Sequence, residues 1–179
     1  MEYRVIRSDR KTTALHITPQ GEVIVRCPRR MPRQTIQALV ESKAAWIATH
    51  LARLKSLPSA PVLTEEELQE LTLKARQLIS QRVSHYAGLL DVSYGRITVR
   101  RQRSRWGSCS SSGNLSFNCL LMLAPAQVLD YVIVHELCHR KEMNHSSRFW
   151  AEVERLCPDY PLHRQWLREH GDALMARLP

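Results

Sequence analysis

One apolar segment constrains the fold more than any other feature. From Pro125 to Leu137 most positions are apolar, and Pro125 suits the first turn of a helix. A helix that is apolar nearly all round has to be buried at the centre of a domain. Near its end, His135-Glu-Leu-Cys-His139 matches the pattern H-E-x-x-H. Burying two histidines and a glutamate there is costly unless they are paired or bind a metal ion.

The spacing of this motif suits a hydrolytic metal site. Residues four apart on a helix project from nearly one face, so His135 and His139 can reach the same metal ion. Glu136 stands beside the first histidine and can act as a general base on a water molecule. We therefore expect both histidines to be metal ligands, Glu136 to be catalytic, and one divalent metal, Zn²⁺, to be the cofactor.

The third metal ligand has to come from beyond this helix, because a catalytic zinc takes three protein ligands and keeps one position open. His145 is the best candidate, since it follows His139 by the same six residues as in the metzincin pattern. On a continuous helix it would lie roughly 15 Å beyond His135. The chain is therefore predicted to leave the helix and fold back. The alternative third ligand is a downstream carboxylate: Glu152, Glu154 or Asp159.

The predicted return of the chain needs a turn and a new helix start. Asn144 tolerates left-handed backbone better than most residues and is predicted to make the turn. Either Asn144 or Ser146 is then expected to cap the helix that carries Phe149 and Trp150.

A second informative segment, residues 101–113, is rich in arginine and serine. The chain carries a formal net charge of +9, and positions 92–129 contain no acidic residue. Arginine binds phosphate groups in a bidentate manner, and tryptophan can stack on a nucleobase. Arg103, Arg105 and Trp106 are therefore predicted to bind substrate. The alternative is a solvated loop in which Trp106 fills the core.

The remaining sequence predicts an α+β protein in two parts. Residues 1–57 are expected to form a small region of strands (2–7, 13–18 and 22–26) and helices (from Pro32 to Leu54). Residues 55–61, with two prolines, are predicted to be a linker. Residues 62–179 are expected to form the catalytic domain, and one integrated domain is the alternative.

Within residues 62–179 the pattern predicts a few further elements. Thr64-Glu-Glu-Glu67 is a capping box for a helix that ends near Gly88. Two short strands are expected, one at Ile97–Val99 and one at Leu115–Cys119, with residues 101–113 forming a surface loop between them. Pro158 and Pro161 predict a break between two C-terminal helices.

Composition limits where such a protein functions. No run of eighteen apolar residues occurs, so no transmembrane helix and no membrane partner is expected. The first residues lack the pattern of a signal peptide. The five cysteines are odd in number and form no Cys-x-x-Cys pair, which favours reduced thiols in a cytoplasmic protein.

Several short motifs follow one another in order over residues 95–162. They are Arg105-Trp-Gly-Ser-Cys-Ser, Asn114-Leu-Ser-Phe-Asn, Ala124-Pro, Asp130-Tyr-Val-Ile-Val-His-Glu-Leu-Cys-His, Asn144-His-Ser-Ser-Arg-Phe-Trp and Pro158-Asp-Tyr. Together they resemble the YgjP-like metal-dependent hydrolases. The resemblance implies a zincin-like domain, related to WLM and SprT-type metallopeptidases, with a central HExxH helix and a short antiparallel sheet. It also implies His135, His139 and His145 as ligands and Glu136 as the catalytic carboxylate.

The preferred prediction at this point is a nucleoside triphosphate (UTP) pyrophosphatase that releases pyrophosphate; a zinc metallopeptidase is the alternative, and a non-catalytic nucleic-acid-binding protein is the third reading. One bacterial member of the family is described as a UTP pyrophosphatase, and the arginines favour such an activity on a small anionic nucleoside triphosphate. A lone three-histidine zinc is unusual for phosphate chemistry, however, which favours Mg²⁺ held by carboxylates. A zinc metallopeptidase of the WLM/SprT-like type would bind an extended peptide by strand addition to the strand near Leu115–Cys119. A non-catalytic nucleic-acid-binding protein with a structural metal leaves Glu136 unexplained.

Overall fold

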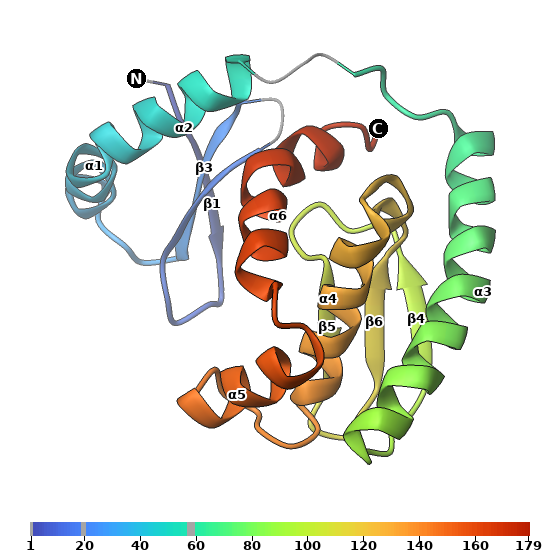
Figure 1. The fold of residues 1–179 in the computed structure, drawn as a ribbon. Helices are drawn as coiled ribbons and strands as arrows, with labels where there is room; N and C mark the ends of the chain where they lie inside the picture. The colour runs from blue at the N-terminus through green and yellow to red at the C-terminus, as the bar shows by residue number, and fades with distance from the viewer. Residues whose placement is uncertain (1, 19–20, 57–59) are drawn as a thin grey trace. The chain divides into compact units, whose positions relative to one another are not determined.

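A computed structural model describes residues 2–18, 21–56 and 60–179 of the chain. The chain forms two compact units, Met1–Ala60 and Pro61–Pro179, which are described one after the other (Figure 1). The predicted linker at 55–61 lies in part outside the described residues. In the part of the chain that is described, no helix combines the length and the apolar character that spanning a membrane requires.

The first unit is a three-stranded sheet with two helices. Its elements are β1 (Arg4–Ser8), β2 (Ala14–Ile17), β3 (Val23–Pro28), α1 (Arg33–Ser42) and α2 (Ala44–Ser56). The strand order is β1-β3-β2, with β1 parallel and β2 antiparallel to β3. Alternate residues of β3, Val23, Val25 and Cys27, are buried against Ile36 and Ile47 of the helices. The strands and helices predicted for this region are confirmed.

The second unit carries the histidine motif. Its elements are α3 (Glu65–Leu90), β4 (Ile97–Arg100), β5 (Gly107–Cys109), β6 (Leu115–Asn118), the 3₁₀ turn η1 (Cys119–Leu123), α4 (Ala126–Cys138), α5 (Ser147–Leu156) and α6 (Tyr160–Met175). The sheet order is β4-β6-β5. Figure 1 shows α4 lying across the sheet, with α3 along the β4 side. The predicted α+β class is confirmed.

Helix α4 is the centre of this unit, as its composition predicts. Val128, Leu129, Val132, Ile133 and Leu137 are all buried. The helix packs against α3, α5, α6 and strand β5. Since α4 is enclosed on several sides, its polar residues are held in fixed positions by the apolar packing around them.

Strand β5 is the element that the sequence does not predict. Residues 101–113 were expected to form a surface loop, yet Gly107–Cys109 pairs antiparallel with β6. The sheet is therefore mixed rather than antiparallel throughout, because β4 runs parallel to β6 and β5 lies in the connection between them. Three residues of Gly, Ser and Cys carry no strand periodicity, which is why the pattern is silent here.

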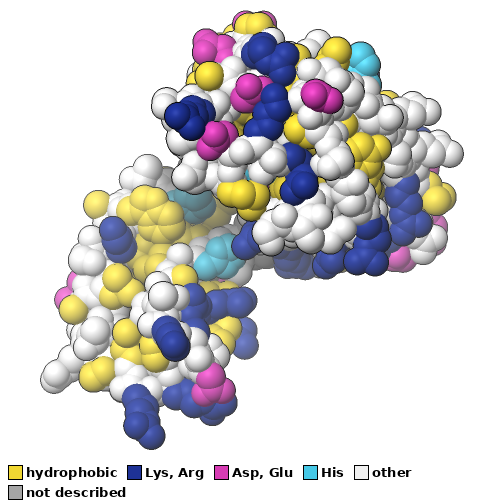
Figure 2. Space-filling view, turned by 90° about the horizontal axis from the view of Figure 1, so that it is seen from below, with side chains coloured by type: hydrophobic (Ala, Val, Ile, Leu, Met, Phe, Trp, Pro, Cys, Tyr) yellow, Lys and Arg dark blue, Asp and Glu magenta, His cyan; other side chains and the backbone are white. Residues whose placement is uncertain are grey.

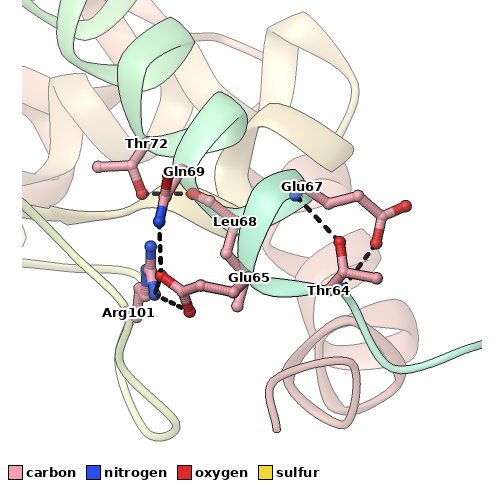
Figure 3. A network of polar contacts seen from close by, with 7 residues as sticks. All are labelled: Thr64, Glu65, Glu67, Leu68, Gln69, Thr72 and Arg101. Atoms are coloured by element: carbon pink, nitrogen blue, oxygen red, sulfur yellow. Dashed lines mark hydrogen bonds and ion pairs between the residues drawn. The ribbon is translucent and has the colours of Figure 1, made fainter.

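The start of α3 is fixed by the predicted capping box (Figure 3). The Glu67 amide donates to the Thr64 hydroxyl at 3.2 Å, and the Glu67 carboxylate accepts from the Thr64 amide at 2.7 Å. In the same network, the Arg101 guanidinium contacts both oxygens of Glu65 at 2.7 and 2.8 Å. This ion pair ties the end of β4 to the first turn of α3.

Removing the cap should measurably destabilise the protein. In Thr64→Ala the Glu67 amide loses its acceptor, and we expect the free energy of unfolding to fall by about 1 kcal/mol. Urea denaturation followed by circular dichroism measures the change. The matched control is Ser80→Ala, at an exposed position inside the same helix, where alanine should cost nothing. Equal stability of the two variants would contradict the role of the cap.

Candidate metal centre

Three histidines converge at the end of α4. His135 lies in the last turn of the helix, His139 is its C-terminal cap, and His145 lies in the connection to α5. One ring nitrogen of each lies within 4.8 Å of one ring nitrogen of the other two. The ring centroids are 4.9 to 5.1 Å apart. The structure thus brings together the three histidines that the sequence predicts to share a metal ion.

The connection between α4 and α5 makes this convergence possible. The helix ends at Cys138, and α5 begins at Ser147 after Ser146 has capped it by accepting a hydrogen bond from the Phe149 amide at 3.3 Å. The predicted turn and the Ser146 cap are confirmed. The left-handed conformation predicted for Asn144 is wrong: of the described non-glycine residues, Asp91 alone has a positive φ. Backbone bonds to Leu137 and Cys138 make the turn instead.

Both helix histidines are held in the neutral form that binds metals. Burial, followed by the nearby imidazoles of His139 and His145, lowers the pKa of His135 to about 3. Burial also lowers the pKa of His139. The His139 Nδ1 lies 3.1 Å from the Glu142 carbonyl oxygen, so it donates there and leaves Nε2 free as a donor atom for a metal ion.

An aromatic floor supports the histidine cluster. The Phe149 ring lies 4.6 to 4.9 Å from all three imidazoles, and Trp150 stacks on His145 at 5.7 Å. Tyr160 from α6 stacks on Trp150 at 5.1 Å, and the Arg164 guanidinium lies over the same indole. Because Phe149 and Trp150 lie in the first turn of α5, the cap at Ser146 also positions this floor.

Glu136 lies beneath strand β5. Its side chain is buried, and burial raises the pKa of its carboxyl to about 8, a shift that the positive charge of Arg105 opposes. A Cβ atom at Gly107 would lie 2.6 Å from Glu136 Oε1 and 2.9 Å from its carboxyl carbon. The backbone of β5 therefore passes directly over the carboxylate, and only glycine leaves space for it.

The donor set fits a divalent metal ion. The Nε2 atoms of His135 and His145 are 3.1 Å apart, as expected of groups that face one centre. The buried Nδ1 of His135 has no hydrogen-bond partner in the described part of the chain, so this imidazole is held by packing. The alternative ligand Glu152 is already paired with Lys141 and Arg155 at 3.1 and 3.2 Å. The histidine cluster includes none of the three alternative ligands Glu152, Glu154 and Asp159.

The three residues predicted to bind substrate lie in different environments. Arg105 is exposed and near enough to Glu136 to oppose the rise that burial causes in the pKa of that carboxyl. Arg103 is exposed as well. Trp106 is half-buried and packs against α6, since its indole would lie 3.2 Å from a Cβ at Gly171. A substrate contact by any of the three stays a prediction.

Sequence reasoning missed the part of the site that β5 builds. Gly107 follows Trp106 in a segment without strand periodicity, and no local signal shows that it lies over Glu136. The glycine itself is the one available hint, because a conformationally permissive residue next to a bulky one can mark a close backbone approach. The glycine alone does not show that the residue it approaches is Glu136.

Comparison with known proteins identifies the family. The model of the family described as "YgjP-like, metallopeptidase domain" matches residues 11–73 and 63–170. No curated protein matches the chain. Two solved structures resemble part of it, both of metallopeptidase zymogens: Pyrococcus abyssi abylysin (20% identity, TM-score 0.46, covering 51% of this chain and 93% of that chain) and Methanocaldococcus jannaschii jannalysin (22%, 0.43, 49% and 94%).

The family match covers most of the sequence, including the HExxH helix, the α4–α5 connection and strand β5. A metallopeptidase domain implies a divalent metal, and the histidine cluster offers a donor set for one. The chain belongs to the YgjP-like family, and it is a metal-dependent hydrolase.

Proposed function

We propose that the protein is a zinc metallopeptidase that binds an extended peptide along β5. The observation that carries this proposal is the position of β5, an edge strand whose Gly107 lies directly over Glu136. A peptide that added to this edge as a further strand would pass the carboxylate and the three histidines. His135, His139 and His145 are proposed to hold the metal, and Glu136 to be the catalytic residue.

Strand addition to Leu115–Cys119, as the sequence predicts, is wrong, because β6 is paired on both sides; the hydrogen-bonding pattern of β5 supports addition at β5 instead. The backbones of Trp106 and Ser110, at the two ends of β5, bond to the strand-β6 side at 2.8 and 2.9 Å. In an antiparallel pair, alternate residues bond to the same neighbour. The N–H and C=O groups of Gly107 and Cys109 therefore point to the free edge, where an extended substrate can pair with them.

The proposed chemistry divides between the metal and the carboxylate. A divalent ion at such a site supplies Lewis acidity to a scissile carbonyl and to a water nucleophile. Glu136 takes a proton from the attacking water at Oε1 and passes it to the leaving amine. Its shielded position under β5, beside the three histidines, suits a group that accepts a proton and returns it within the same site.

A nucleoside triphosphate (UTP) pyrophosphatase is the second candidate function. The observation that favours it is Arg105, an exposed guanidinium whose charge reaches Glu136. Such a cation can stabilise a phosphate group undergoing attack. The donor set favours the peptidase, because three imidazoles suit zinc, whereas phosphoryl transfer generally uses Mg²⁺ held by oxygen ligands.

The Glu136→Gln variant tells peptide cleavage from pyrophosphate release, and it tells both from the activity of a contaminating enzyme. We expect at least a 100-fold loss of zinc-dependent cleavage of an unfolded protein substrate, because an amide cannot accept the proton. Cleavage is measured by mass spectrometry and pyrophosphate release from UTP by a coupled assay. The matched control Glu154→Gln, on the exposed side of α5, should keep full activity. Pyrophosphate release that disappears in Glu136→Gln, without any proteolysis, would replace the peptidase proposal by the second candidate.

The third ligand can be tested without any substrate. In His145→Ala we expect most of the bound zinc to be lost, because two imidazoles hold the ion far less tightly than three. Elemental analysis after gel filtration measures the metal content. His85→Ala, at an exposed position on α3, is the control and should keep one equivalent. Stoichiometric zinc in His145→Ala would move the third ligand to another residue.

The contact between β5 and Glu136 predicts a specific effect of a single methyl group. In Gly107→Ala the new Cβ would overlap the carboxylate, and we expect a kcat lowered by about 100-fold, as for a catalytic group displaced by about 1 Å. Zinc content should stay unchanged. The matched control Gly88→Ala adds a methyl group with no atom within 4 Å and should leave activity intact. Full activity in Gly107→Ala would show that Glu136 is not held where the structure places it.

A further inference from the structure

The sheet of the second unit has a polar face opposite α4. Ile97, Val99, Leu115 and Phe117 pack into the core, so alternate residues of the same strands point the other way. Ser116 of β6 lies in register with Thr98 of β4 on one side and with Ser108 of β5 on the other. These three residues form a continuous row of hydroxyl groups, which we call the outer sheet face.

Arginines surround the outer sheet face. Arg96 and Arg100 lie two residues before and after Thr98, and Arg76 of α3 and Arg105 lie at the two sides. All four are exposed. Three hollows of about 400, 590 and 340 Å³ adjoin one another over this face, and Arg100 lines each of them.

The charge of this face is not neutralised within the unit. Arg82 and Arg101 pair with Asp130 and Glu65. By contrast, Arg76, Arg96 and Arg100 have no ion pair with any carboxylate that the structure describes, and none of the three hollows has an acidic residue in its described lining. Figure 2 shows Lys and Arg side chains gathered along one border of the larger body. The face is therefore complementary to a polyanion.

We propose that the outer sheet face binds the phosphate backbone of a nucleic acid. Arginine, serine and threonine side chains are the donors that proteins use for backbone phosphates. Arg96, just before β4, and Arg100, at its end, are four residues apart along an extended chain, hence roughly 13 Å from each other, which suits two separate phosphates of one backbone better than one compact anion. The described lining contains no aromatic side chain for base stacking, so binding is independent of sequence.

This surface borders the proposed catalytic site at Arg105, whose charge reaches Glu136, but its row of hydroxyl groups points away from that carboxylate. Gly107 faces Glu136, and its neighbour Ser108 therefore points to the opposite side of the sheet. The inference does not depend on which bond the metal centre hydrolyses, and it can fail or succeed independently of the proposed function.

Fluorescence anisotropy with a labelled 20-base-pair duplex, and with a single strand of equal length, tests the proposal. For Arg96→Gln/Arg100→Gln in the full chain we expect at least tenfold weaker binding and a salt-dependence slope smaller by about 2, because two phosphate contacts are lost. Unchanged zinc content and thermal stability show that the variant is folded. The probe with the lower Kd shows whether the partner is double-stranded or single-stranded.

The matched control removes the same charge elsewhere. Lys74→Gln/Arg148→Gln changes two exposed cations outside the hollows and should leave the slope nearly as in the wild type. An equal loss in both double variants would overturn the proposal, since net charge alone would then explain binding. Absence of binding to either nucleic acid would also overturn it. So would competition by stoichiometric UTP, which would make the face a nucleotide site.

Discussion

The close contact between Gly107 and Glu136 is the constraint on which the catalytic unit depends. Burying a carboxylate on an apolar helix is unfavourable unless it is paired or lies beside a bound metal ion. Here the backbone of β5 covers the Glu136 carboxylate. The contact fixes the distance between the sheet and α4 at the point where the helix presents its histidines. Burial of Leu115 and Phe117 on one side and Ile133 and Leu137 on the other maintains that distance. Fold and proposed chemistry thus share one contact.

Much of this arrangement follows from local sequence. The apolar character of Val128–Leu137 predicts a central helix, the capping box predicts the start of α3, and the six-residue offset predicts that His145 returns to His135. Each of these signals acts over a few residues and depends on helix geometry. The local sequence is therefore sufficient to predict these three features. The α+β class follows in the same way from the alternation of short strands and longer helices.

The parts that could not be predicted depend on contacts between distant segments. Strand β5 forms because β6 offers it a partner, not because Gly107–Cys109 favours a strand, and the sheet is mixed for the same reason. The turn at Asn144 needs no left-handed residue, because backbone bonds to the end of α4 complete it. The environment of Trp106 depends on a distant segment as well, because its indole packs against Gly171 of α6; a substrate contact by Trp106 stays a prediction.

The shortness of β5 has a consequence for self-association. An exposed strand edge that accepts a peptide can equally accept another copy of the chain and begin aggregation. The three residues of β5 can form only a few backbone hydrogen bonds, and the arginines that precede β5 repel the same arginines of a second copy of the chain. A strand this short can bind a peptide that other contacts also hold, whereas two folded copies of the chain would gain too few backbone hydrogen bonds from it to stay paired.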